Sequence, residues 1–187
     1  MKSYYAIVAI SLVTSTAPAI AGGADYAAFV ETQVAAFAGN PLIQDALAAS
    51  SAAHATYTTT EILTLDAEWR DQIDNTSKPV IVPVIDAPVS AFLRQIVSDS
   101  GGSIVEVILM DQYGLNVGIS SITSDFWQGD EDKFRQTYAR GIGSIHASDV
   151  SLDESTGMYV VQVSFPVLDA DGQMVGAASF SLDAEQL

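Results

Sequence analysis

The chain has 187 residues, a length that predicts a single domain. It carries 23 acidic side chains against 7 lysines and arginines, and this net charge of −16 excludes nucleic acid as a partner, because phosphate binding requires clustered basic side chains. The chain has no cysteine, which excludes thiol catalysis and zinc sites with cysteine ligands.

The first 21 residues have the pattern of a signal peptide. Lys2 gives a positive start, Ala6 to Val13 form an apolar run, and Ala19-Ile20-Ala21 is a small-x-small cleavage site. The alternative is an N-terminal membrane anchor, but the apolar run is too short to span a bilayer. We therefore expect a signal peptide over 1–21 and a periplasmic or secreted mature chain over 22–187, without membrane insertion of that chain.

Residues 24–75 are predicted to be mainly helical. Apolar residues recur at three- and four-residue steps from Tyr26 to Phe37, which predicts an amphipathic helix that ends near Gly39-Asn40-Pro41. An alanine-rich helix over 42–53 and a helix over 60–73, with Thr60 as its N-cap, are expected next. The apolar stripe of this third helix is expected to comprise Ile62, Leu63, Leu65, Trp69 and Ile73.

Residues 78–187 are predicted to form an α/β core. The segment from Lys78 to Asp86 contains Pro83, which indicates an edge strand or an extended linker, and a helix over 87–98 follows. The expected strands, joined by short turns, cover 104–110, 115–122, 158–167 and 173–182. Helices followed by an antiparallel sheet predict an α+β fold, in which one face of the sheet is packed and the other is left free.

The stretch T-S-D-F-W-Q-G-D-E-D-K-F, residues 123–134, combines two features. Its acids, with Asp130 as cap, suit the start of a helix whose inward stripe would be Phe134, Tyr138 and Ile142. The residues before it suit a small-molecule pocket, which needs apolar walls and a few polar groups. The alternative is a polar surface loop pinned by one buried tryptophan. The candidate pocket residues here are Ser120, Thr123, Asp125, Trp127 and Gln128.

The order of the motifs resembles the Cache family, also called PDC, whose extracytoplasmic sensor domains are related to PAS domains. The motifs are V-E-V-I-L-M-D-Q-Y-G, then S-S-I-T-S-D-F-W-Q-G-D-E, then M-Y-V-V-Q-V-S-F-P-V-L-D-A-D-G-Q-M-V-G-A. The resemblance implies a PAS-like fold with the long N-terminal helices on one sheet face and a ligand between the other face and the 120–130 loop. It further implies that Tyr159, Val161 and Val163 face the helix, whereas Gln162 and Ser164 face the pocket or solvent.

The sequence also departs from the family. Amino-acid-binding Cache domains have an Arg and a Trp two residues apart, but the matching segment here reads Asp132-Lys133-Phe134-Arg135, so that specificity is not carried over. Most Cache domains lie between two membrane spans, whereas this chain ends at Leu187, directly after the last predicted strand. The chain therefore resembles a stand-alone sensor domain, 22–187, without an output domain of its own.

The leading hypothesis is an exported module that binds a small organic ligand and signals through a membrane sensor kinase or chemoreceptor. Because many Cache domains pair through the N-terminal helix, we also expect a homodimer. One alternative is a structural or adaptor protein of the same fold without a ligand, and another is a small exported hydrolase.

Catalysis, metals and cofactors have little support in the sequence. No nucleophile–base pair is recognisable, so we expect no enzyme activity. His54 and His146 lack zinc-site spacing, and Asp169-Ala170-Asp171-Gly172 lacks the later ligands of a calcium loop and is interpreted as a hairpin turn. We therefore expect neither a metal ion nor a cofactor.

Overall fold

The computed structural model describes residues 26–153 and 156–186. The predicted signal peptide and its cleavage site lie outside the described residues. Within them, α-helices and one antiparallel sheet form an α+β fold, as predicted. The helices are α1 (Tyr26–Ala38), α2 (Pro41–His54), α3 (Thr59–Gln72), α4 (Ile81–Ile85), α5 (Pro88–Asp99) and α6 (Asp132–Arg135), and a short 3-10 turn covers Tyr138–Arg140.

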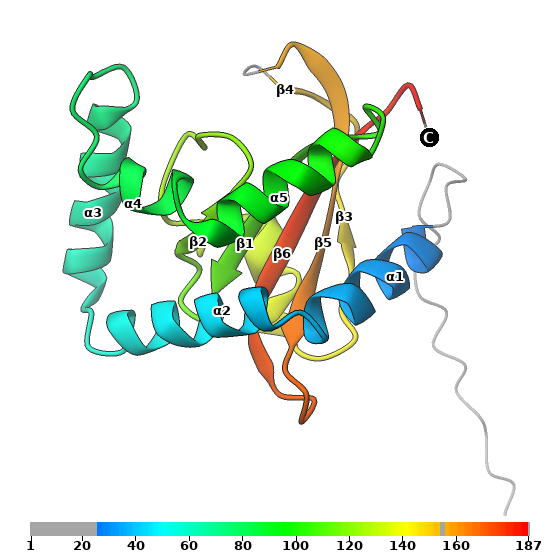
Figure 1. Cartoon of the computed structure of the whole chain (residues 1–187), viewed down its shortest axis with the longest axis horizontal. Helices are drawn as coiled ribbons and strands as arrows, with labels where there is room; N and C mark the ends of the chain where they lie inside the picture. Colours follow the sequence, from blue (N-terminus) through cyan, green and yellow to red (C-terminus); the bar gives the residue numbers. More distant parts are fainter. Residues whose placement is uncertain (1–25, 154–155, 187) are drawn as a thin grey trace, which may run out of the picture.

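Six strands form the sheet within the described residues, in the spatial order β2-β1-β6-β5-β3, with β4 also paired to β5. Figure 1 shows the long central strands β1, β6 and β5 running behind the helices. The strands are β1 (Ile104–Asp111), β2 (Asn116–Ile119), β3 (His146–Ala147), β4 (Ser151–Asp153), β5 (Met158–Leu168) and β6 (Met174–Asp183).

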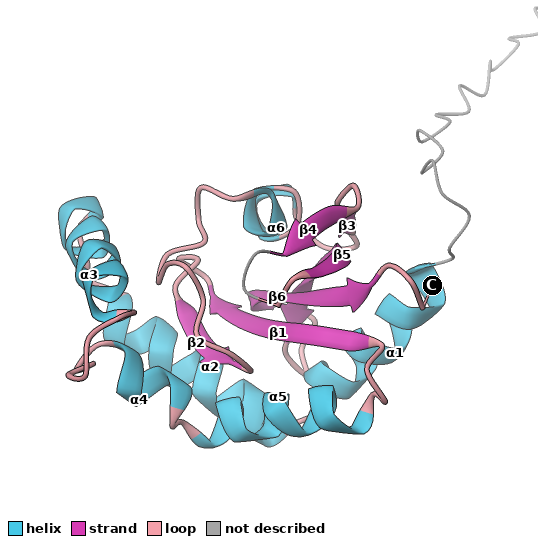
Figure 2. Ribbon diagram, turned by 90° about the horizontal axis from the view of Figure 1, so that it is seen from above, coloured by secondary structure: helices cyan, strands magenta, loops and turns pink. Residues whose placement is uncertain are grey.

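The helices α1, α2 and α5 cover one face of the sheet, and α6 lies on the other (Figure 2). Phe37 of α1 is 1% exposed and packs against Phe165 and Phe180 of the sheet, with ring centroids 6.2 and 5.6 Å apart. Truncation of such a buried aromatic ring costs about 3–5 kcal/mol. Val161 and Val163 also belong to this core, so the predicted helix-facing side of β5 is confirmed for these two residues. Tyr159, which was expected to join them, pairs with Leu152 of β4 and is 55% exposed.

Local sequence explains where the N-terminal helices begin. Asn40 caps α2, because its side-chain oxygen accepts a hydrogen bond from the Leu42 N–H at 3.0 Å. Thr58 caps α3 and forms a reciprocal capping box with Glu61, so the predicted cap at Thr60 is wrong by two residues. Leu63, predicted in the apolar stripe of α3, is 49% exposed.

The segment 78–86 is not a strand or an extended linker, because it contains the helix α4. Pro83 is the third residue of this helix, a position at which the backbone N–H has no partner within the helix. A proline there removes no helical hydrogen bond, and its fixed φ suits a helical turn.

Two further predictions on the second half of the chain are wrong. The predicted helix after Asp130 is only the short α6, and Ile142, expected inside, is 65% exposed. α6 ends at Arg135, and the separate 3-10 turn that follows it ends at Gly141, whose φ of 101° lies outside the helical region. The predicted strand over 115–122 is limited to β2, and the short strands β3 and β4 were not predicted at all.

Pro166 lies within β5, on the part of the strand that extends beyond its pairing with β3. The backbone groups of Gln162 point toward β3, because its carbonyl accepts the Ser148 N–H at 2.9 Å. Since backbone direction alternates along a strand, the nitrogen of Pro166 points to the same side, beyond the last residue paired with β3.

No helix among the residues described here is both long enough and apolar enough to span a membrane.

Candidate functional site

A cavity of about 450 Å³ lies on the sheet face opposite α1, α2 and α5. Its floor comes from β1 and β5, and its walls come from β4, the residue Lys133 and the loop 122–128. We call it the sheet-face cavity. It is lined by Ile73, Glu106, Ile108, Ile122, Thr123, Ser124, Asp125, Gln128, Lys133, Ser151, Leu152, Asp153, Val160 and Gln162.

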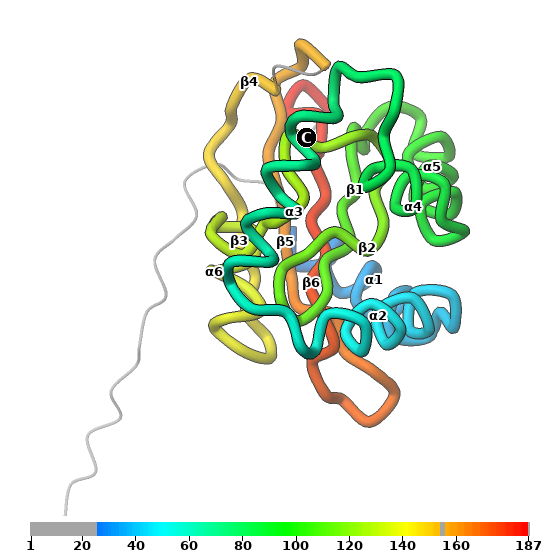
Figure 3. Tube along the Cα trace, turned by 90° about the vertical axis from the view of Figure 1, so that its left-hand side faces the viewer, coloured from blue at the N-terminus to red at the C-terminus, as the bar shows by residue number. Residues whose placement is uncertain are grey.

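The loop 123–128 is held in place by α3, which runs beside it (Figure 3). Trp69, fully buried, donates its indole N–H to the Thr123 carbonyl at 2.9 Å. The Asp66 carboxylate, 2% exposed, accepts the backbone N–H groups of Phe126 and Trp127 at 2.9 and 3.0 Å. These three hydrogen bonds fix the cavity wall before any ligand arrives, which lowers the entropic cost of binding.

Four of the residues expected at a ligand site line this cavity. Thr123, Asp125 and Gln128 come from the loop, and Gln162 comes from β5. The Gln128 amide donates to the Asp125 carboxylate at 2.6 Å, and the Thr123 hydroxyl donates to the Asp125 carbonyl at 2.7 Å. The loop is thus cross-linked by its own side chains, which orients the polar groups of the wall.

The structure does not bring Trp127 into the cavity. Its indole N–H donates to the Tyr113 carbonyl at 2.9 Å, and its ring packs on Gly129. A Cβ atom at Gly129 would lie 2.3 Å from the indole nitrogen, so the ring fills the space that the glycine leaves. Trp127 therefore closes the end of the β1–β2 hairpin.

Ser120 and Ser164 also lie outside the sheet-face cavity. The Ser120 hydroxyl accepts the Val107 N–H at 2.9 Å and thereby extends the pairing of β1 with β2. Ser164 is on the expected face of β5, but it is completely buried and its hydroxyl donates to Ser179 at 2.9 Å. The face of β5 on which Ser164 lies was predictable, because side chains alternate along a strand. The position of α6 over that face was not predictable.

Glu106 and Lys133 are two of the lining residues that were not predicted from the sequence. Glu106 lies in β1, where its carboxylate accepts a hydrogen bond from Ser121 at 2.6 Å. Lys133, 8% exposed, donates to Gln128 at 2.9 Å and pairs with Glu131 at 2.9 Å. The signal for Glu106 was present, because a single acid within the apolar run V-E-V-I-L-M is unusual for a strand buried on both faces. Nothing in the sequence signals the burial of Lys133.

The cavity is electrostatically suited to a cation. Burial raises the pKa of the Glu106 carboxyl, and the hydrogen bond from Ser121 offsets only part of this effect. Burial, and next the negative charge of Glu131, raise the pKa of the Asp125 carboxyl. Both groups would be stabilised in their ionised form by a positive charge in the cavity. Among the residues described, no three His, Asp or Glu side chains gather in a way that could hold a metal ion.

Ser50, His54 and Asp111 form a separate cluster under α2. Asp111 accepts hydrogen bonds from the Ser50 hydroxyl at 2.9 Å and from His54 Nδ1 at 2.6 Å. The Ser50 hydroxyl is 3.3 Å from the same nitrogen, Nδ1. In a catalytic triad the acid and the serine contact different imidazole nitrogens, so this cluster lacks the arrangement for proton transfer from serine.

No family model and no curated protein matches the chain. Solved structures to which it is similar include the ligand-binding domain of the Campylobacter jejuni chemoreceptor Tlp3, with 14% identity, a TM-score of 0.43, and coverage of 86% of this chain and 61% of that one. The chain thus spans less than two thirds of that domain.

Two further similar structures are sensor domains. That of E. coli DcuS has 12% identity and a TM-score of 0.39, with coverage of 68% of this chain and 89% of that one. That of the V. cholerae histidine kinase DctB has 15% identity and a TM-score of 0.36, with coverage of 84% and 57%.

Proposed function

We propose that the chain is an exported sensor module that captures a small organic ligand in the sheet-face cavity. The observation that carries the proposal is the convergence of polar side chains from three separate segments, around 106, 123–128 and 162, on one preorganised cavity. Its volume of about 450 Å³ falls within the range of small-molecule sites. The resemblance of the motifs to Cache domains supports the same function.

We infer that the ligand carries a protonated amine. Glu106 and Asp125 supply two carboxyl groups, and the ion pairs among the described residues involve neither of them. Lys133 is engaged by Glu131 and Gln128, so its charge is already balanced within the wall. An ammonium group would donate to both carboxylates, and the Gln162 amide would contact the rest of the ligand.

In this proposal the module acts outside the cytoplasm and passes the binding event to a membrane sensor kinase or chemoreceptor, as a homodimer. The signal-peptide pattern of residues 1–21 supports the location. The Cache resemblance supports the type of partner and the pairing of two copies.

Calorimetric titration with butylamine and with butyrate, two probes of similar size and opposite charge, tests the site. We expect saturable binding of butylamine alone, with at least about tenfold weaker affinity for Glu106→Gln and Asp125→Asn, since each removes a charge-assisted hydrogen bond. Glu68→Gln, on the exposed side of α3, is the matched control and should bind as the wild type does.

Absence of saturable binding by either probe would count against the ligand-binding function. It would favour a structural or adaptor protein of the same fold. One feature supports that alternative. Leu152 of β4 and Tyr159 of β5 are paired and are 51 and 55% exposed, Val150 just before β4 is 59% exposed, and the three offer apolar surface to another protein.

A further inference from the structure

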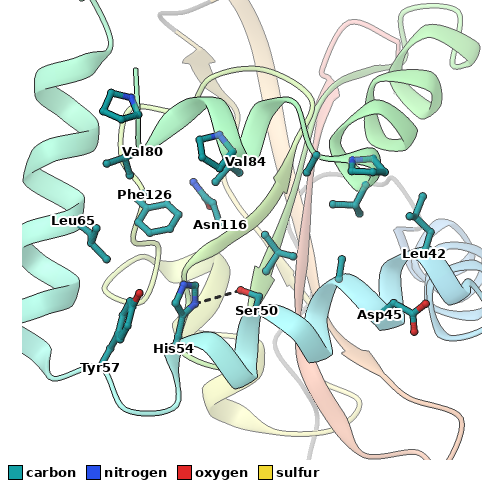
Figure 4. Close-up of a pocket in the computed structure, with 17 residues that line it drawn as sticks. Leu42, Asp45, Ser50, His54, Tyr57, Leu65, Val80, Val84, Asn116 and Phe126 are labelled. Atoms are coloured by element: carbon teal, nitrogen blue, oxygen red, sulfur yellow. Dashed lines mark hydrogen bonds between the residues drawn. The ribbon is translucent and has the colours of Figure 1, made fainter. Parts of the chain in front are cut away.

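A second cavity, of about 620 Å³, lies on the helical side of the sheet (Figure 4). It is bounded by α2, α3, α4 and the start of α5, and β2 forms its floor. We call it the interhelical cavity. It shares no lining residue with the sheet-face cavity, and its walls are mainly aliphatic and aromatic, with Leu65, Val84 and Phe126 at one end.

Asn116 places an unpaired hydrogen-bond acceptor at this cavity. The residue is 2% exposed, and its amide NH₂ donates to the Thr123 hydroxyl at 2.9 Å and to the Asp125 carbonyl at 3.0 Å. These two bonds fix which way the amide is turned. Its Oδ1 is then buried without a partner, the one side-chain atom in that condition among the described residues. A buried acceptor without a donor is costly, so a donor at this position would be bound favourably.

His54 adds an imidazole ring at the same end of the cavity. Its ring lies 6.3 Å from the Phe126 ring and projects into the cavity from α2 (Figure 4). Nδ1 lies 2.6 Å from the buried Asp111 carboxylate, so Nε2 is the ring nitrogen left for other contacts. This end of the cavity therefore combines polar groups with apolar walls.

We propose that the interhelical cavity is a second ligand site, which takes a neutral phenol-like molecule. The ring would be buried against Leu65, Val84 and Phe126, and the O–H would donate to Asn116 Oδ1. A neutral ligand is favoured because the mainly apolar walls cannot solvate a charge. This site is independent of the amine site proposed for the sheet-face cavity.

The test is a titration of the full chain with para-ethylphenol, followed by the methyl NMR signals of Leu65 and Val84. The matched probe is para-ethylanisole, which has the same ring but no O–H. We expect saturable shifts at both residues, with affinity for the phenol about three- to tenfold higher than for the anisole, the effect of one net hydrogen bond. Equal affinities for the two probes, or saturable shifts only at Ile108 and Ile122 of the sheet-face cavity, would overturn the proposal.

Two variants of α2 provide a further test. Ala46 lines the cavity, so Ala46→Phe should fill it and abolish the shifts caused by para-ethylphenol. Ala49→Phe adds the same ring on the exposed side of the helix and should leave the binding unchanged. Binding of para-ethylphenol to folded Ala46→Phe with wild-type affinity would overturn the assignment. If Ala46→Phe fails to fold, the comparison of the two probes on the wild-type chain still decides.

Discussion

Asp66 should be sensitive to substitution, because its one carboxylate holds the wall of the proposed ligand site. It is 2% exposed, accepts the N–H groups of Phe126 and Trp127, and is also contacted by the Arg70 guanidinium. A hydrogen bond to a charged group contributes about 1.5–3 kcal/mol, and a buried N–H that loses its acceptor adds a penalty of about 1–3 kcal/mol. We therefore expect Asp66→Ala to lower the free energy of unfolding by about 3–5 kcal/mol.

Urea unfolding followed by far-UV circular dichroism measures this loss. Asp71→Ala is the matched control, since Asp71 lies on the exposed side of the same helix, and it should change stability by less than about 0.5 kcal/mol. Asp66→Asn keeps an acceptor but loses the charge, so its effect should fall between the two. Equal unfolding free energies for Asp66→Ala and Asp71→Ala would refute the role of this carboxylate as the anchor of the loop.

Three other predictions follow from single features. Gly129→Ala should lower the melting temperature, because the added Cβ would lie 2.3 Å from the indole nitrogen of Trp127. Gly39→Ala is the control and should not lower it, because its nearest contact would be at 3.5 Å; thermal melting compares the two variants. Burial raises the pKa of Glu106 above its ordinary value of 4.5, so the folded state binds the proton more tightly than the unfolded state does. The free energy of unfolding should therefore fall as the pH rises from about 4.5 through the folded-state pKa. In urea titrations Glu106→Gln should remove that part of the pH dependence. An unchanged pH profile in the variant would contradict the assignment to Glu106. Light scattering of the purified chain should give the mass of a dimer, and a monomer mass at high concentration would refute the pairing.

The long elements could be predicted from sequence because their patterns extend over many residues. The apolar spacing from Tyr26 to Phe37 and the alternation along β5 each leave one dominant interpretation. The short elements could not be predicted. The helix α4 depends on where Pro83 falls within it, and β3 has only two residues, so neither carries a usable period.

The candidate site was only partly predictable for a related reason. Thr123, Asp125 and Gln128 are near one another in sequence, so their common location follows from one loop. Glu106 and Lys133 reach the same cavity only through the pairing of β1 and the position of α6, which sequence patterns do not specify. Trp127 misled the prediction because an indole suits a ligand site and a hairpin plug equally well, and the difference lies in its contact with Gly129.

The position of Pro166 has a consequence for how this edge of the sheet is closed. β5 extends beyond β3 here, and the stretch around Pro166 is buried. A buried backbone N–H without an acceptor is costly, but proline has no N–H, so its nitrogen leaves no donor unsatisfied. The chain can therefore cover this part of β5 with side chains, and residues 142–145, which line a cavity together with Phe165 and Pro166, need not pair with it as a strand.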